Sequence, residues 1–184
     1  RQINKQDKEQ QPVRNLPPGT AKITFTSGTT GTPKGVCLSR TGIETLAFSI
    51  QKSLDNKFAT RHAVILPLAI LLGNIAGVYP TLIAGGTIFI PPLSEIGLRN
   101  PFTPDLKQLT SYLRAQKITS VITVPELLRG LFSIRAALPD MKFMAVGGAK
   151  VAPELIAAAR EAGLPVYEGY GLSEAASVVA LNTP

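Results

Sequence analysis

The residue types best suited to chemistry lie between Thr26 and Lys34, in the stretch TSGTTGTPK. Glycine tolerates unusual backbone dihedral angles and lets a ligand approach closely, so that backbone N–H groups can face an anion. Threonine and serine add hydroxyl donors, and Lys34 adds a positive point charge. The stretch therefore predicts a phosphate-binding loop rather than an ordinary polar loop.

Two familiar phosphate-binding patterns do not fit this loop. A Walker A loop needs G-x-x-x-x-G-K followed by Ser or Thr. Here Gly28 is followed by Gly31, and Lys34 stands between Pro33 and Gly35. The dinucleotide pattern G-x-G-x-x-G is not matched either. The loop is therefore of another kind.

The elements that must position this loop alternate along the chain. Short apolar runs predict strands, at 21–28, 62–68, 87–92, 120–124, 142–148 and 165–171. Segments with helical period lie between them, at 40–54, 71–86, 103–117, 125–138 and 152–163. The alternation predicts an α/β fold, with a doubly wound, mostly parallel sheet and helices on both faces.

Two of the predicted helices have well-defined core faces. In the helix at 40–54 this face is formed by Ile43, Leu46, Ala47 and Ile50. In the helix at 103–117 it is formed by Leu106, Leu109 and Leu113. Thr103 is the predicted N-cap of that helix, with Pro104 in the first helical position.

Ligands of such sheets bind beyond the carboxyl ends of the strands. Two polar segments follow predicted strands and are therefore candidates for a site. One is the loop after the first strand, and the other is GYGLSE at 169–174, after the last. We expect both segments to belong to one ligand site.

The motifs resemble those of the adenylate-forming superfamily, which includes acyl-CoA synthetases, luciferases and peptide-synthetase adenylation domains. A Ser/Thr/Gly-rich run that ends in Pro-Lys-Gly is the hallmark of that superfamily. EGYGLSE at 168–174 is similar to its second nucleotide motif, and VGGAKV at 146–151 is similar to the strand end that lines the adenine and acyl pocket. The resemblance covers residues 20–184.

The resemblance implies a reaction in two steps. ATP and a carboxylic acid, here expected to be a fatty acid, give an acyl-adenylate, and coenzyme A then takes the acyl group. It also implies roles for single residues. Lys34 and Glu174 are implied as catalytic residues, and Glu174 also as a ligand of Mg²⁺. The residues implied to bind the nucleotide are Thr26, Ser27, Gly28, Thr29, Thr30, Gly31, Gly147, Gly148, Ala149, Gly169, Tyr170, Gly171 and Ser173.

The sequence departs from the superfamily pattern at two places. Ala69 and Ile70 stand where relatives often carry an aromatic residue and a histidine beside the acid, so an apolar acid site is expected. The ribose-binding Thr-Gly-Asp segment and the C-terminal catalytic lysine are not found in the 184 residues. We therefore interpret 1–19 as a mobile lead-in and 20–184 as part of the large N-terminal domain, inactive by itself.

Composition limits the other function classes. The formal net charge is +7, but no arginine-rich run or basic–aromatic pattern supports nucleic acid binding. A single cysteine, Cys37, and a single histidine, His62, make a disulfide framework, a zinc site or a Ser-His-Asp triad improbable. No transmembrane segment or signal peptide is expected. The expected location is the cytoplasm, with peripheral membrane association left open.

Two alternatives remain open at this point. One is an amino-acid or aryl-acid adenylation domain, although no Asp occupies residues 70–75 to meet a substrate ammonium group. The other is a non-catalytic relative that binds a nucleotide. The presence of both Lys34 and Glu174 favours retained chemistry.

Overall fold

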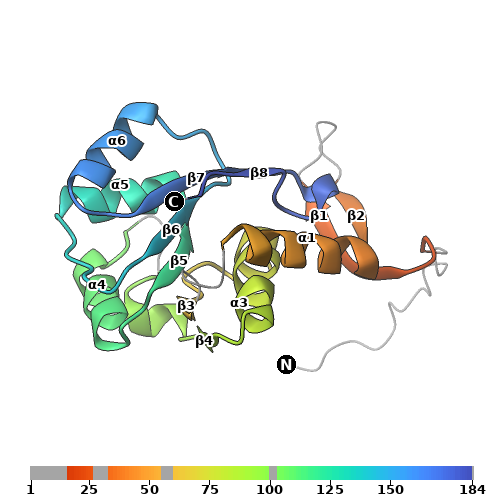
Figure 1. Ribbon diagram of the computed structural model, residues 1–184, viewed down its shortest axis with the longest axis horizontal. Coiled ribbons are helices and arrows are strands. Elements are labelled where there is room, and N and C mark those ends of the chain that lie inside the picture. The colour runs from red at the N-terminus through yellow and green to blue at the C-terminus, as the bar shows by residue number, and fades with distance from the viewer. Residues whose placement is uncertain (1–15, 27–32, 55–59, 100–102, 184) are drawn as a thin grey trace, which may run out of the picture.

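The computed structural model describes residues 16–26, 33–54, 60–99 and 103–183. Figure 1 shows a central sheet with helices on both sides and a separate hairpin beside it. The strands are β1 (Thr20–Thr26), β2 (Lys34–Ser39), β3 (Arg61–Ala63), β4 (Thr87–Phe89), β5 (Ser120–Thr123), β6 (Phe143–Val146), β7 (Val166–Tyr170) and β8 (Ala180–Leu181). The predicted mobile lead-in at 1–19 lies mostly outside the described residues and stays a prediction.

The central sheet has the strand order β4-β3-β5-β6-β7-β8. Every pair is parallel except β7 with the short β8, which is antiparallel. β5 and β6 are buried along their whole length, as expected of central strands in a parallel sheet. This confirms the predicted α/β fold with a mostly parallel sheet.

The helices lie in two layers, one on each face of the sheet (Figure 1). They are α1 (Arg40–Ser53), α2 (Leu71–Gly73), the π-helix η1 (Asn74–Val78), α3 (Tyr79–Ile83), the 3₁₀-helix η2 (Leu93–Ile96), α4 (Leu106–Ala115), α5 (Pro125–Ser133), α6 (Pro153–Glu161) and the 3₁₀-helix η3 (Ser173–Ala175). Helices α4, α5 and α6 cover one face, and α1 with the segment from α2 to α3 covers the other.

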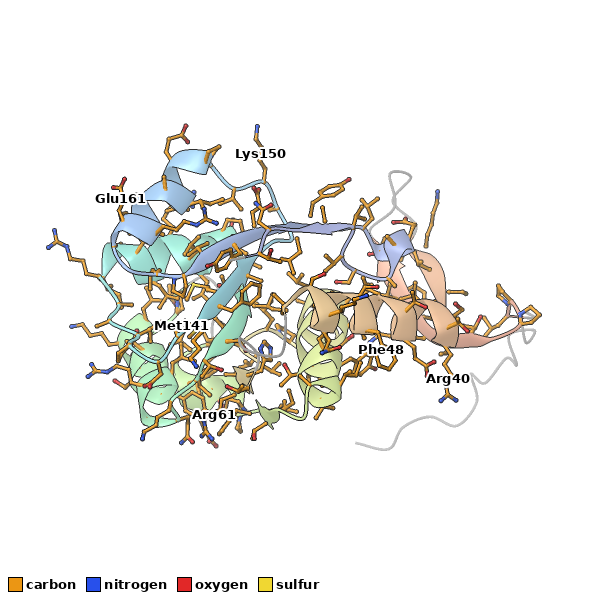
Figure 2. The ribbon with its side chains drawn as sticks, viewed as in Figure 1. Arg40, Phe48, Arg61, Met141, Lys150 and Glu161 are labelled. Carbon is orange, nitrogen blue, oxygen red and sulfur yellow. The ribbon has the colours of Figure 1, made fainter. Side chains whose placement is uncertain are left out.

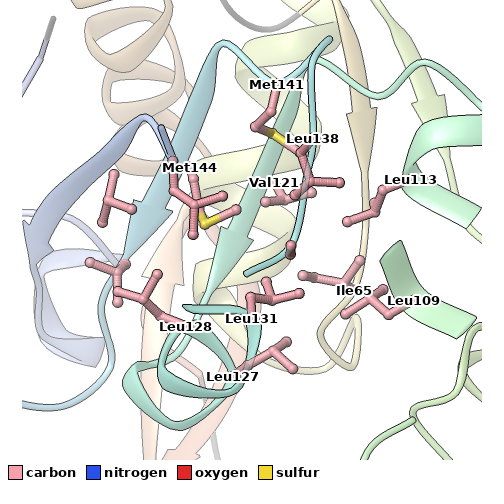
Figure 3. Close-up of a cluster of buried hydrophobic side chains, with 14 of the residues drawn as sticks. Ile65, Leu109, Leu113, Val121, Leu127, Leu128, Leu131, Leu138, Met141 and Met144 are labelled. Carbon is pink, nitrogen blue, oxygen red and sulfur yellow. The ribbon is translucent and has the colours of Figure 1, made fainter. Parts of the chain in front are cut away.

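Each layer has its own buried apolar cluster. Figure 3 shows the larger one, in which Leu109 and Leu113 of α4 and Leu128 and Leu131 of α5 pack on Val121 and Met144 of the sheet. On the opposite face, Ile50 of α1 packs with Ile122 and Phe143. Burial of each such side chain contributes about 1.5–3 kcal/mol to folding. The two clusters hold the carboxyl ends of the strands in fixed positions.

The first strand does not belong to the parallel sheet. β1 pairs antiparallel with β2 in a separate two-stranded sheet, from Thr26 opposite Lys34 to Thr20 opposite Ser39. The sequence pattern predicts a strand at 21–28 but no element at 34–39. The predicted phosphate loop is therefore the connection of a hairpin.

Two helix details also differ from the predictions. The N-cap of α4 is Asp105, whose carboxylate accepts from the backbone N–H of Gln108 at 2.9 Å, and not Thr103. The single helix predicted at 71–86 is divided, because residues 74–78 form a π-helical turn between α2 and α3.

Among the described residues, no helix is both long and apolar enough to cross a membrane.

Candidate functional site

A cleft of about 380 Å³ lies at the carboxyl end of the sheet. It is bounded by β1, by residues 69–72 after β3, by the loop after β6, and by residues 169–173 at the end of β7. The lining residues are Thr24, Phe25, Ala69, Ile70, Leu71, Leu72, Gly148, Gly169, Tyr170, Gly171, Leu172, Ser173, Ser177 and Val178. Several segments remote in sequence thus meet at one hollow.

Glycines make the close approaches around this cleft possible. A Cβ on Gly171 would lie 1.5 Å from the carbonyl oxygen of Ser177, so no side chain fits there. A Cβ on Gly147 would lie 2.9 Å from the carbonyl oxygen of Gly169, where β6 and β7 run together. Gly148 has φ +86°, a conformation that favours glycine. The glycines of the VGGAKV and GYGLSE segments are therefore required by close backbone contacts or by backbone conformation.

The hairpin brings Thr26 and Lys34 opposite one another at the end where the loop connects its two strands. The Thr26 hydroxyl donates to the carbonyl oxygen of Lys34 at 3.5 Å. The Lys34 side chain is exposed. The predicted phosphate-binding residues Ser27, Gly28, Thr29, Thr30 and Gly31 lie outside the described residues. Thr24 and Phe25, which precede these residues on β1, line the cleft.

A third apolar cluster joins the hairpin to the end of the chain. Leu38 of β2 and Ile43 of α1 pack with Leu71, Ile75 and Ala176. Ala176 directly follows η3, which contains Ser173 and Glu174. Figure 1 shows η3 beside the hairpin. This cluster holds β2 and the residue after η3 together, although they lie about 140 residues apart in the sequence.

Half of the described candidate residues lie on the cleft. Gly148, Gly169, Tyr170, Gly171 and Ser173 line it directly. Thr26, Gly147, Ala149 and Glu174 are sequence neighbours of lining residues but are not part of the wall. Lys34 is one step farther away, since it pairs with Thr26. The exposed Lys150 points away from the body of the protein (Figure 2).

Sequence reasoning missed four residues of the wall. They are Thr24, Phe25, Ser177 and Val178. Phe25 is 72% exposed, and a Cβ on Gly35 of the facing strand would lie 3.4 Å from its ring. The alternation of Ile23 and Phe25 with threonines could have marked a two-sided strand outside the parallel sheet. Ser177 belongs to none of the predicted motifs. Its position in the wall depends on the close approach of its carbonyl oxygen to Gly171.

The wall of the cleft contains both apolar and polar side chains. Ala69, Ile70, Leu71 and Leu72 form an apolar stretch of the wall. Ser173 and Ser177, from a segment remote in sequence, supply hydroxyl groups. Among the described residues, no three His, Cys, Asp or Glu side chains form a metal-binding cluster. Glu174 is an exposed carboxylate on η3, next to Ser173.

His62 does not contribute to the cleft. It is buried on β3, where its Nδ1 lies 3.0 Å from the hydroxyl of Ser120. Burial lowers the pKa of His62 to about 4, because the charged imidazolium loses its hydration. The ring is therefore neutral at pH 7 and acts as a core residue.

Comparison with protein families gives a match over residues 1–184, to the family described as AMP-binding enzyme. A probable CoA ligase, CCL9, from Humulus lupulus is 29% identical over 173 residues, which are 92% of this chain and 32% of that protein. The oxalate–CoA ligase of Arabidopsis thaliana is 28% identical and covers 91% of this chain and 32% of its own length.

Among solved structures, the o-succinylbenzoate coenzyme A synthetase of Bacillus subtilis, in complex with ATP and magnesium ion, superposes with a TM-score of 0.75. It is 25% identical, and the match covers 90% of this chain and 33% of that chain. The 184 residues thus span about a third of the length of the relatives that they match.

Proposed function

The chain belongs to the family of AMP-binding enzymes, as its motifs predict. From this we propose that the complete protein activates a carboxylic acid with ATP and transfers the acyl group to coenzyme A. The observation that carries this proposal is the cleft. It brings Thr24 and Phe25 of β1 together with residues 169–173 and the apolar residues 69–72 around one hollow. The relatives named as CoA ligases support the acceptor.

The first step is attack of a carboxylate oxygen on the α-phosphorus of ATP, with pyrophosphate as the leaving group. The protein's task in such a step is to position the reactants and to balance negative charge. We assign the β- and γ-phosphates to the loop 26–34, with Lys34 as the charged donor. We assign the α-phosphate to the hydroxyl of Ser173. Tyr170, which is exposed in the cleft, offers a flat ring to the adenine.

The exposed carboxylate of Glu174, which follows Ser173 of the cleft wall, fits a magnesium ion bound together with ATP. Mg²⁺ keeps several waters and takes one or two carboxylates in addition to phosphate oxygens. Glu174 supplies one carboxylate next to the proposed α-phosphate position. When bound, the ion would neutralise part of the phosphate charge. Glu174 would orient it, and Lys34 would act on the phosphates from the hairpin side.

For the acid, we propose a fatty or other apolar carboxylic acid. The support comes from residues 69–72, which present only apolar side chains to the cleft. A polar substrate group buried beside them without a partner would cost about 1–3 kcal/mol. Each methylene buried there would contribute about 0.8 kcal/mol.

The test is ATP–pyrophosphate exchange by the complete protein with acetate, octanoate, palmitate, benzoate and a set of amino acids. We expect kcat/KM to rise from acetate to longer apolar acids until the pocket is filled. Fastest exchange with acetate or with a charged amino acid would refute the apolar acid. AMP binding without exchange for any acid would refute the enzymatic proposal and favour a nucleotide-binding module.

A further inference from the structure

The apolar side of the cleft is formed by a turn and the first helical residues after it. The turn runs from Pro67 to Ile70 and is closed by the backbone N–H of Ile70, which donates to the carbonyl oxygen of Pro67 at 2.9 Å. Ile70 is 44% exposed, and Leu71 begins α2. An exposed turn of this kind can hold a ligand in one position only if contacts with buried residues fix its backbone.

That support comes from Asn74. Its side chain is only 6% exposed, and its Nδ2 donates to the carbonyl oxygen of Leu68 in the middle of the turn, at 2.5 Å. Its backbone N–H donates to the carbonyl oxygen of Ile70 at 3.3 Å. Asn74 therefore connects the turn to the helical segment behind it through both its side chain and its backbone.

The side-chain oxygen of Asn74 lowers the stability of the fold. Within the described part of the chain, Asn74 Oδ1 is the one buried side-chain nitrogen or oxygen that has no hydrogen-bond partner. A buried polar atom without a partner destabilises a protein, whereas an apolar residue of similar shape avoids that loss. The bond to Leu68 is the evident gain that offsets it.

The segment that contains Asn74 is itself held in place. Asn74 is the first residue of the π-helical turn η1, and π-turns often occur at functional sites. A Cβ on Gly77 would lie 2.5 Å from Nε2 of the buried His62, so the turn packs directly on that ring. The hydroxyl of Thr81 donates to the carbonyl oxygen of Gly77 at 2.8 Å. The helical segment that carries Asn74 is thus fixed on the sheet.

We propose that Asn74 is a positioning residue for the acid: it fixes residues 68–72, and so sets where the apolar part of the substrate lies. The proposal rests on the function proposed above, since it assigns this wall to the acid. Asn74 touches neither ATP nor the reacting carboxylate in this assignment. Its effect should therefore fall on the acid and not on the nucleotide.

The first experiment compares Asn74→Asp with Thr81→Val in the complete protein. Asn74→Asp keeps the shape but removes the N–H that the Leu68 carbonyl accepts. Thr81→Val removes a buried hydrogen bond from the same helical segment, farther from the cleft. The readout is pyrophosphate exchange with the acid of the above panel that has the highest kcat/KM. Asn74→Asp should raise KM for that acid about tenfold or more, with KM for ATP within about twofold. Thr81→Val should change neither constant.

A second readout does not depend on catalysis. Hydrogen exchange of the Ile70 amide should become about tenfold faster in Asn74→Asp and stay unchanged in Thr81→Val, because only the first substitution releases the turn. If Asn74→Asp does not fold, Asn74→Ala provides the same comparison. Equal effects of the Asn74 and Thr81 variants on KM and on exchange at Ile70 would overturn the proposal, since they would indicate a merely structural residue.

The two readouts separate the two proposals. If the unsubstituted protein shows no pyrophosphate exchange with any acid, the proposed function fails, and with it the role toward the acid. Faster amide exchange at Ile70 in Asn74→Asp would then still show that the Asn74 side chain holds the turn at residues 67–70 in place. A changed KM for ATP with an unchanged KM for the acid would refute the positioning role while leaving the enzymatic proposal intact.

Discussion

At the scale of single residues, the cleft depends on positions where a side chain is excluded and on a few that carry charge. Gly171 faces the carbonyl oxygen of Ser177 so closely that even a methyl group would displace the backbone. Lys34 and Glu174 are exposed and belong to elements that the third apolar cluster holds together. The steric residues shape the hollow, and the charged residues are available to a ligand.

The charged residues give the first prediction. In the complete protein, Lys34→Ala and Glu174→Ala should each lower the rate of pyrophosphate exchange about 10²–10³-fold, because each removes a pre-organised partner of developing charge or of the metal. Lys150→Ala and Glu161→Ala are matched controls, since both side chains are exposed and lie off the cleft. Variants of Lys34 and Glu174 within threefold of the parent would show that these side chains are not needed for the chemistry.

His62 gives a prediction on pH. Its pKa is about 4 in the folded protein and 6.5 in a model peptide, so between these values the unfolded chain binds a proton that the folded chain does not. The contribution of His62 to stability is complete above pH 6.5 and decreases as the pH falls toward 4. The loss is roughly 3 kcal/mol at 1.36 kcal/mol per unit.

Urea unfolding at several pH values would measure this loss. His62→Gln, which does not titrate in this range, should show a shallower decrease in the free energy of unfolding between pH 7 and pH 4.5. Parallel curves for the two proteins would mean that His62 is not the group responsible.

At the scale of elements, sequence patterns predicted the strands and helices whose own residues determine their structure. β5, β6 and β7 follow from short apolar runs, and α1 and α5 from helical period. β2 was missed because Lys34–Ser39 becomes a strand through pairing with β1, and its own residues include glycine and charge. The π-turn was missed because apolar spacing cannot distinguish it from a regular helix. β8 has two residues, too few for a pattern.

The candidate site shows the same division. Gly169, Tyr170, Gly171 and Ser173 could be named from a motif, and they line the cleft. Phe25 and Val178 could not, because their place in the wall depends on how the hairpin and the last residues pack on the sheet. Asn74 was also missed, since its importance comes from one hydrogen bond to a turn six residues earlier.

The N-terminus of α4 gives a prediction at this scale. Asp105→Ala should lower the free energy of unfolding by about 1 kcal/mol, because the first-turn N–H of Gln108 loses its acceptor. Thr103→Ala should have a smaller effect, although the sequence pattern favoured Thr103 as the cap. Thermal or urea unfolding of the two variants decides between them, and a larger loss for Thr103→Ala would contradict the structure.

At the scale of the whole molecule, one sheet separates two apolar layers and carries the cleft at its carboxyl end. The formal charge of +7 suits an anionic ligand such as ATP. The matched relatives are about three times as long as these 184 residues. The resemblance assigns the ribose-binding Asp and a catalytic lysine to segments outside them.

Residues 1–184 on their own should therefore form no acyl-CoA. We expect no product from ATP, coenzyme A and any acid of the panel, measured by chromatography with purified protein free of host enzymes. The complete protein is the positive control. Turnover by the 184 residues would show that the cleft suffices for the reaction without the further segments.

The self-paired hairpin has a consequence for engineering. Of the described strands, β1 and β2 pair only with each other, so residues 27–32 join two strands that contribute no hydrogen bond to the parallel ladder. The loop can therefore be treated as an exchangeable cassette. Grafting the corresponding loop of another family member between Thr26 and Pro33 should change the proposed phosphate contacts and leave the register of the six-stranded sheet as it is.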